Sequence, residues 1–317
     1  MRIITVRGIP GEAAMKKNGS FINFLVRKGT SPEQERISGL PLRETVTIYC
    51  DMYGIPHVYA ENQEDAMISL GYLHARDRLW QIETLRRYAS GRLAEIAGEN
   101  MVNSDWFARL AGFQDLHTRA LKHLDDRNRA LYQAYIDGIN GYIELCGKKL
   151  PLEFTSLKLE PEPFTMENAC GALPVNAWFL QTNYLEEILA LTAKERVTSE
   201  IWNDLFPSSP GAKLPGEDFF TKFASVKTGK LIPAALGYYS GASAAVGNSN
   251  IWVHAAGSGG APLLANDPHL GIMLPQVWYF CHLHAPELNV CGASMPGMPG
   301  IIIGRTEQIA WGMTNVM

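Results

Sequence analysis

Apolar residues recur at helical spacing in the first part of the chain. They predict a helix that begins after the N-cap residue Asn62 and ends at Gly91, a suitable C-cap residue. A second helix is predicted over residues 116–145, although Gly138 and Gly141 weaken its second half. These helices would wrap and support the strands that follow them.

Strand-like runs lie mainly in the last part of the chain. Residues 250–255 and 261–266 are apolar runs joined by the glycine-rich segment 257–260, which predicts a hairpin. Earlier in the chain, residues 46–49 read as a strand and residues 169–194 as mostly helical. Helices first and strands later predict the α+β class.

Changes in composition predict four regions. Residues 1–42 form a polar, glycine-bearing N-terminal extension without a clear period. Residues 43–236 form a mostly helical region, residues 237–248 a linker, and residues 249–317 a strand-rich region. The linker consists of small residues, as is typical of an exposed and cleavable connector.

Composition fits a globular protein and excludes some functions. The chain has 317 residues, of which 46% are hydrophobic and 19% charged, enough for a sizeable core. A net charge of −4 gives no basic surface for nucleic acid or for an anionic membrane. No apolar run approaches the roughly 18 residues of a membrane span. Five cysteines without close spacing indicate reduced thiols.

Ser249 stands where the linker meets the first strand of the predicted hairpin. A serine hydroxyl is a poor nucleophile without a base, and the α-amino group of a chain, with a pKa of about 7.7 to 8.0, is such a base. Cleavage of the bond between Asn248 and Ser249 would place nucleophile and base on one residue. The alternative is an ordinary polar residue at the start of a strand.

A zinc hydrolase is a second reading of the chain. His282 and His284 are two residues apart in a strand-like stretch, so they would face the same side, with Cys281 and Cys291 nearby. Zinc hydrolases use such pairs together with a third ligand. The usual ligand spacings are absent here, which disfavours this reading.

Several motifs together resemble the penicillin acylase family of N-terminal nucleophile hydrolases. In the first part they are an Asp-x-x-Gly-x-Pro-His turn at residues 51–57 and a Gly-Tyr-x-His-Ala-x-Asp-Arg-x-Trp-Gln signature at residues 71–81. In the second part they are Ser-Asn-x-Trp from Ser249, Asn-Asp-Pro-His from Asn266 and Ala-Trp-Gly-x-Thr-Asn from Ala310. Their number and their order make the resemblance specific.

The resemblance implies a fold and a reaction. The fold would be the family's four-layer αββα sandwich, incomplete here, with residues 43–236 in the α chain and residues 249–317 at the start of the β chain. The two chains of one precursor would stay associated after cleavage. The reaction would be hydrolysis of a linear amide with release of an acyl group, and the substrate a small molecule such as an N-acyl homoserine lactone, an acylated β-lactam or an acylated peptide.

The resemblance also implies roles for individual residues. Ser249 would attack the carbonyl of Asn248 to cleave the precursor, and then attack the substrate amide to form an acyl-enzyme. His269 would hydrogen-bond the serine. The backbone N–H of Asn315 or Val316 would donate to the oxyanion. Asp77 and Arg78 recur in the signature, but we expect them to form an ion pair outside the site, with Trp80 in the core.

Calcium is the one cofactor that the resemblance implies, and no organic cofactor is expected. Glu187 is the candidate ligand in the first part of the chain. Family precursors are much longer than this chain, so it is interpreted either as a fragment or as a truncated, non-catalytic remnant of an acylase. Members of the family are usually periplasmic or secreted, yet the apolar run 21–26 is too short for a signal peptide, so the localisation stays open.

Overall fold

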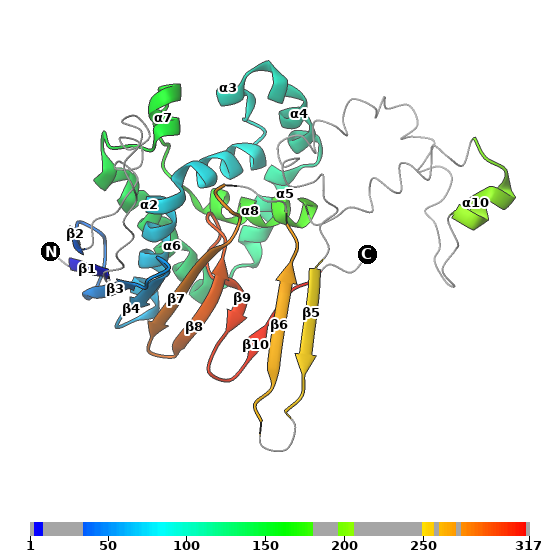
Figure 1. Cartoon of the computed structure of the whole chain (residues 1–317). Coiled ribbons are helices and arrows are strands. Elements are labelled where there is room, and N and C mark those ends of the chain that lie inside the picture. Colours follow the sequence, from blue (N-terminus) through cyan, green and yellow to red (C-terminus); the bar gives the residue numbers. More distant parts are fainter. Residues whose placement is uncertain are drawn as a thin grey trace, which may run out of the picture.

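The computed structural model describes residues 3–8, 34–179, 196–205, 249–256, 260–270 and 274–314. In this part of the chain a layer of helices lies against one face of an eight-stranded sheet, and a separate two-stranded sheet stands beside it (Figure 1). The predicted α+β class is confirmed. Of the expected sandwich, the described residues contain one helical layer, the main sheet and this second, small sheet.

The helices of the described residues are α2 (Gln63–Ala89), α3 (Ala94–Ala97), a 3-10 turn (Glu99–Met101), α4 (Val102–Leu110), α5 (Phe113–His123), α6 (Asp126–Cys146), α7 (Leu152–Leu157), α8 (Met166–Phe179) and α10 (Ser199–Leu205). The first predicted helix is confirmed as α2. Asn62 is its N-cap and accepts a hydrogen bond from the backbone N–H of Asp65. Ser90 ends the helix, and Gly91 follows with a φ of +60°.

The helix predicted over residues 116–145 is wrong in one respect, because it is two helices. α5 ends at His123, Leu124 is extended, and α6 begins after Asp125. The carboxylate of Asp125 accepts a hydrogen bond from the backbone N–H of Asn128 at 2.7 Å, which caps a new helix. The apolar stripe continues across this break, so hydrophobic spacing alone did not reveal it.

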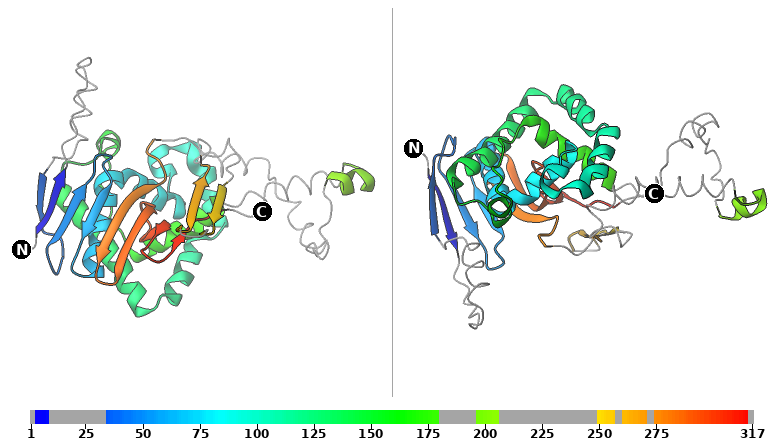
Figure 2. Two further views of the ribbon diagram at one scale, coloured as in Figure 1. Left: turned by 60° about the horizontal axis from the view of Figure 1, so that its bottom comes forward. Right: turned by 90° about the horizontal axis from the view of Figure 1, so that it is seen from above.

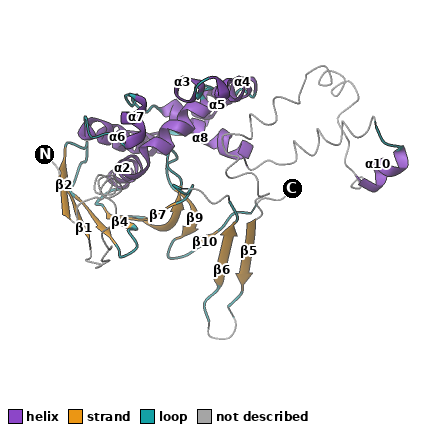
Figure 3. Cartoon of the chain, turned by 45° about the horizontal axis from the view of Figure 1, so that its top comes forward, coloured by secondary structure: helices purple, strands orange, loops and turns teal. Residues whose placement is uncertain are grey.

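Helices α2 and α6 cross with their backbones in contact (Figure 3). A Cβ atom on Gly71 would lie 2.0 Å from the carbonyl oxygen of Tyr135, and one on Gly138 would lie 2.0 Å from that of Ile68. Only glycine at both positions permits this approach. The glycine that weakens α6 as an isolated helix therefore allows its packing on α2.

The strands are β1 (Ile3–Gly8), β2 (Gln34–Ser38), β3 (Val46–Cys50), β4 (Pro56–Tyr59), β5 (Ser249–His254), β6 (Leu263–Pro268), β7 (Tyr279–Ala285), β8 (Leu288–Ser294), β9 (Ile301–Arg305) and β10 (Ala310–Trp311). The main sheet has the order β10-β9-β8-β7-β4-β3-β1-β2, and β5 and β6 pair only with each other. The predicted strand at residues 46–49 and the predicted hairpin are confirmed. Residues 257–259 of the hairpin loop lie outside the described part.

The main sheet joins the two ends of the sequence. β4 pairs in parallel with β7, and His57 lies opposite His282 in the register. β1 to β4, which precede the linker, thus form half of this sheet, so the strand-rich part of the molecule is not confined to residues after 249. β1 and β2, from the region predicted as an N-terminal extension, lie at one edge (Figure 2).

The core lies between the sheet and the helices. Val46, Ile48 and Val58 from the sheet and Leu70 and Leu73 from α2 are fully buried together. Along β7 buried and more exposed residues alternate, as expected for a strand covered on one face. No helix among the described residues is long and apolar enough to span a membrane.

The structure also shows the cysteines and the contacts of Asp77 and Trp80. All five cysteines are free, without a disulfide bond among them. The ion pair predicted for Asp77 forms with Arg76 at 2.8 Å and not with Arg78, which sits at an interruption of α2 with a φ of −143°. Tyr279 also donates to the carboxylate of Asp77, at 2.7 Å. Trp80 packs edge-on against Phe154, as expected of a core residue.

Candidate functional site

Ser249 is the first residue of β5. It is half-buried and lies opposite Pro268, the last residue of β6, in the antiparallel register. In Figure 1 the hairpin stands next to β10, beyond the end of the main sheet that lies opposite β1 and β2. The position of the predicted nucleophile at the start of a strand follows from the change from small linker residues to the β-branched and aromatic residues of β5.

The segment after β10 reaches the start of β5. The hydroxyl of Thr314 donates a hydrogen bond to the carbonyl oxygen of Ser249 at 2.8 Å. Asn315 and Val316, the predicted oxyanion donors, directly follow Thr314 but lie outside the described residues. The structure therefore brings the chain that precedes these donors to the predicted nucleophile.

Asn266 connects the same two segments from β6. Its Nδ2 donates to the carbonyl oxygens of Asn250, at 2.9 Å, and of Met313, at 3.0 Å. Its Oδ1 accepts from the backbone N–H of Met313 at 3.0 Å. Sequence reasoning named this residue only as part of a motif and missed its contacts, as it did those of Thr314.

His269 directly follows Pro268, which is the hairpin residue that lies opposite Ser249. Its Nε2 is 2.7 Å from Oδ2 of Asp267, and both side chains are exposed to solvent. The structure thus pairs His269 with a carboxylate and places its imidazole at the same end of the hairpin as Ser249. A carboxylate partner of this kind orients an imidazole. The sequence feature that could have pointed to Asp267 is its position in the Asn-Asp-Pro-His motif.

Two further predicted residues have no described position. Asn248, on the other side of the predicted cleavage point, and Glu187, the candidate calcium ligand, lie outside the described residues. Their roles stay predictions, as do those of Ser249 and His269.

A buried histidine supports the strands from the helical side. His74 of α2 is fully buried between the hydroxyls of Tyr135, 2.8 Å from Nδ1, and Ser294, 2.8 Å from Nε2. The Ser294 hydroxyl donates to the carbonyl of Tyr279, and the backbone N–H of Gly297 donates to the Tyr135 hydroxyl. Burial lowers the pKa of His74 to about 3. It is therefore a neutral structural link and not a general base near pH 7.

His282 and His284, the two histidines considered as zinc ligands, lie on the same face of β7, as predicted. The Nδ1 atom of His282 lies 3.2 Å from the Nδ1 atom of His57. The Nε2 atom of His282 is 2.8 Å from the side-chain oxygen of Asn289. Cys281 points to the opposite, buried side of the strand, where burial raises its pKa to about 12. Among the described residues no group of three or more His, Cys, Asp or Glu side chains could hold a metal ion.

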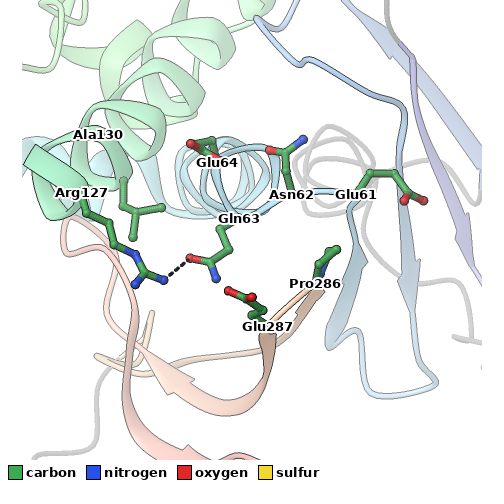
Figure 4. Close-up of a pocket in the computed structure, with 9 residues that line it drawn as sticks. Glu61, Asn62, Gln63, Glu64, Arg127, Ala130, Pro286 and Glu287 are labelled. Atoms are coloured by element: carbon green, nitrogen blue, oxygen red, sulfur yellow. Dashed lines mark hydrogen bonds between the residues drawn. The ribbon is translucent and has the colours of Figure 1, made fainter.

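A shallow cavity of about 320 Å³ lies elsewhere in the molecule, between the start of α2, the start of α6 and the turn from β7 to β8 (Figure 4). Glu61, Glu64 and Glu287 border it, and Arg127 donates to Gln63 across it at 3.3 Å. None of the residues that line it belongs to the hairpin or to the segment after β10. It does not contribute to the site around Ser249.

A helix-covered sheet whose strands come from both sides of a linker, with a serine at the start of the strand after that linker, fits the acylase class that the motifs indicate. The chain belongs to the penicillin amidase family, whose sequence model matches residues 45–317. This finding confirms the resemblance that the separate motifs indicated.

Two curated relatives give the extent of the match. Acyl-homoserine lactone acylase QuiP of Pseudomonas aeruginosa is 30% identical over 285 residues, which cover 87% of this chain and 34% of that protein. Penicillin acylase 2 proenzyme of Pseudomonas sp. strain SE83 is 31% identical over 271 residues, which cover 82% of this chain and 34% of that protein. The chain thus spans about a third of the length of these relatives.

A solved structure also matches. It is that of a thermostable penicillin G acylase from Alcaligenes faecalis in a tetragonal form, which is 22% identical. The match covers 54% of this chain and 96% of that chain, with a TM-score of 0.44.

Proposed function

We propose that this chain is part of an acylase that hydrolyses a linear amide and releases its acyl group, with Ser249 as the nucleophile. Membership of the penicillin amidase family supports amide hydrolysis. The observation that carries the choice of Ser249 is the hydrogen bond from Thr314 to its carbonyl oxygen, because it brings the chain before the predicted oxyanion donors to the first residue of β5.

The first step is cleavage of the precursor. The Ser249 hydroxyl oxygen attacks the carbonyl carbon of Asn248, the C–N bond breaks, and the nitrogen of Ser249 takes up the hydroxyl proton. The resulting ester links Asn248 to the Ser249 side chain. Water hydrolyses this ester, which leaves a carboxylate on Asn248 and a free α-amino group on Ser249.

The second step is turnover of the substrate. The freed amino group of Ser249 accepts the hydroxyl proton, directly or through a water, while the oxygen attacks the substrate carbonyl. Backbone N–H groups of Asn315 or Val316 donate to the oxyanion, and loss of one such donor costs about 2.7 to 4 kcal/mol in related chemistry. The substrate amine leaves with the proton, and water then releases the acyl group from Ser249.

His269 assists the serine in this proposal. The pairing with Asp267 fixes one ring nitrogen, which leaves Nδ1 free to interact with the amine or hydroxyl of Ser249. No organic cofactor takes part in these steps, and calcium, with Glu187 as a candidate ligand, would have a structural role.

The names of the relatives favour a substrate class. Several are acyl-homoserine lactone acylases, and others are penicillin acylases. We therefore propose a small N-acyl amide, with an N-acyl homoserine lactone as the first compound to test. The two chains made by cleavage would remain associated as one enzyme.

Substitution of Ser249 by alanine in the full gene product tests this function. The variant should lose both the cleavage after Asn248 and the release of acid from N-decanoyl homoserine lactone, by about three orders of magnitude or more, because the nucleophile is gone. Ser156→Ala, at an exposed position of α7, is the matched control and should retain both. Acid release by Ser249→Ala at the wild-type rate would exclude Ser249 as the nucleophile.

A further inference from the structure

We infer that Asn266 is a positioning residue, which holds the chain that leads to the oxyanion donors at a fixed distance from Ser249. This inference rests on the proposed function. It concerns a residue that contacts neither the substrate carbonyl nor the hydroxyl of Ser249, and that acts through the backbone of two other segments.

The side chain of Asn266 makes hydrogen bonds to the backbone of two other segments. A primary amide offers two N–H donors and a carbonyl acceptor, and here all three are used on backbone groups. One bond goes to Asn250 on β5, next to Ser249. Two bonds go to Met313, 47 residues further along the chain. A single side chain therefore links the strand of the nucleophile to the segment after β10.

The segment after β10 packs tightly against the side chain of Asn266. A Cβ atom on Gly312 would lie 2.8 Å from Cβ, Cγ and Oδ1 of Asn266, so the segment packs directly against the amide. Glycine at 312 is what permits this approach. Since Cβ and Cγ are fixed near the backbone of β6, the side chain cannot move away without losing its three bonds. The contact thus defines the position of the segment along the hairpin.

The contact between Asn266 and Met313 lies close in the sequence to the predicted oxyanion donors. Thr314 lies one residue after Met313, and its hydroxyl holds the carbonyl oxygen of Ser249 at 2.8 Å. Asn315 and Val316 follow directly. A donor helps an oxyanion only when it is held near the position of the developing charge, and a misplacement of about 1 Å can lower a rate about 100-fold. Asn266 fixes the register of this segment two residues before the donors.

A purely structural role for Asn266 is the alternative. In that case its loss would lower the stability of the hairpin and affect catalysis only through the amount of folded enzyme. A positioning role instead predicts a lower turnover number in a folded enzyme that still binds its substrate. The two roles are therefore separated by measuring kcat, KM and thermal stability on the same preparations.

The experiment compares Asn266→Ala and Asn266→Asp with the wild type in the full gene product. Asp has nearly the shape of Asn and keeps the acceptor for Met313, but it loses both donated bonds and places a charge against two carbonyl oxygens. Val253→Ala is the matched control, because Val253 lies at the far end of β5 and is 71% exposed. Kinetics are measured with N-decanoyl homoserine lactone, and the start of the second chain is determined by mass.

We expect kcat to fall about 10- to 100-fold in both Asn266 variants, with KM within about threefold of the wild type and the melting temperature of the purified protein nearly unchanged. Val253→Ala should match the wild type in all these measurements.

Three outcomes overturn the inference: a kcat within about twofold of the wild type, an equal loss of kcat in Val253→Ala, or failure of both Asn266 variants to fold, which would make the residue a requirement for folding. Failure of the proposed function has a different signature. In that case the wild type itself yields no chain that begins at Ser249, whatever the behaviour of the variants.

Discussion

At the scale of single residues, His74 shows how a polar side chain can serve as part of the core. Each of its ring nitrogens has a hydroxyl partner, and these partners reach α6, β8 and the turn at Gly297. The network is satisfied only if the imidazole is neutral with a proton on one nitrogen, because the Tyr135 hydroxyl, which accepts from Gly297, donates to Nδ1. The sequence placed His74 in a family signature but gave no sign of these partners, since they come from segments far apart in the chain.

This burial predicts a dependence of stability on pH. The pKa of His74 is about 3 in the folded protein, against an ordinary value of 6.5, so below pH 6.5 the unfolded chain binds the proton more readily. The stability that His74 contributes is therefore complete above pH 6.5 and is lost as the pH falls. The free energy of unfolding should drop by about 1.4 kcal/mol between pH 7.5 and 5.5 from this residue alone.

Urea unfolding of the wild type, His74→Gln and His123→Gln at both pH values measures this effect. His74→Gln should have a smaller pH slope than the wild type, whatever its stability at pH 7.5. His123 is an exposed residue at the end of α5, and its substitution should leave the slope unchanged. Equal slopes in all three proteins would contradict the assignment to His74.

At the scale of elements, periodicity predicted what depends on neighbouring residues and missed what depends on distant ones. The helix between Asn62 and Gly91 and the hairpin from Ser249 were predicted because caps, turns and apolar spacing are local signals. The break at Asp125 was missed because the apolar stripe of α5 runs on into α6. The parallel pairing of β4 with β7 has no local signal, since it joins His57 to His282 across most of the chain.

The crossing of α2 and α6 gives a prediction at this scale. Gly138→Ala would gain about 1 kcal/mol of helix propensity in an isolated helix. In the protein its methyl group would meet the carbonyl oxygen of Ile68 at 2.0 Å, and no side-chain rotation can relieve a contact between a Cβ and a backbone atom. Overpacking of this kind costs about 1 to 3 kcal/mol. We expect net destabilisation, measured as a lower midpoint of urea unfolding.

The matched control for this substitution is Gly260→Ala, because a Cβ atom there meets nothing within 4 Å. It should change the midpoint little. A Gly138→Ala variant that is as stable as the wild type, or more stable, would show that the helices separate without cost.

At the scale of the whole molecule, cleavage before Ser249 would not divide the structure into independent halves. β1 to β4 precede the linker and β7 to β10 follow it, and all eight lie in one sheet. The sequence predicted Ser249 and His269 through motifs. It could not predict the links made by Asn266, Asp267 and Thr314, because these depend on how the fold brings the end of β6 and the segment after β10 to the start of β5.

The most direct test is the mass of the full gene product after purification and maturation, measured once in denaturant and once under native conditions. In denaturant we expect two chains, of which the second begins Ser-Asn-Ile-Trp. Under native conditions we expect a single species that contains both, held together by the shared sheet. A product that stays uncleaved after prolonged incubation, or that is cut at another bond, would contradict the role of Ser249.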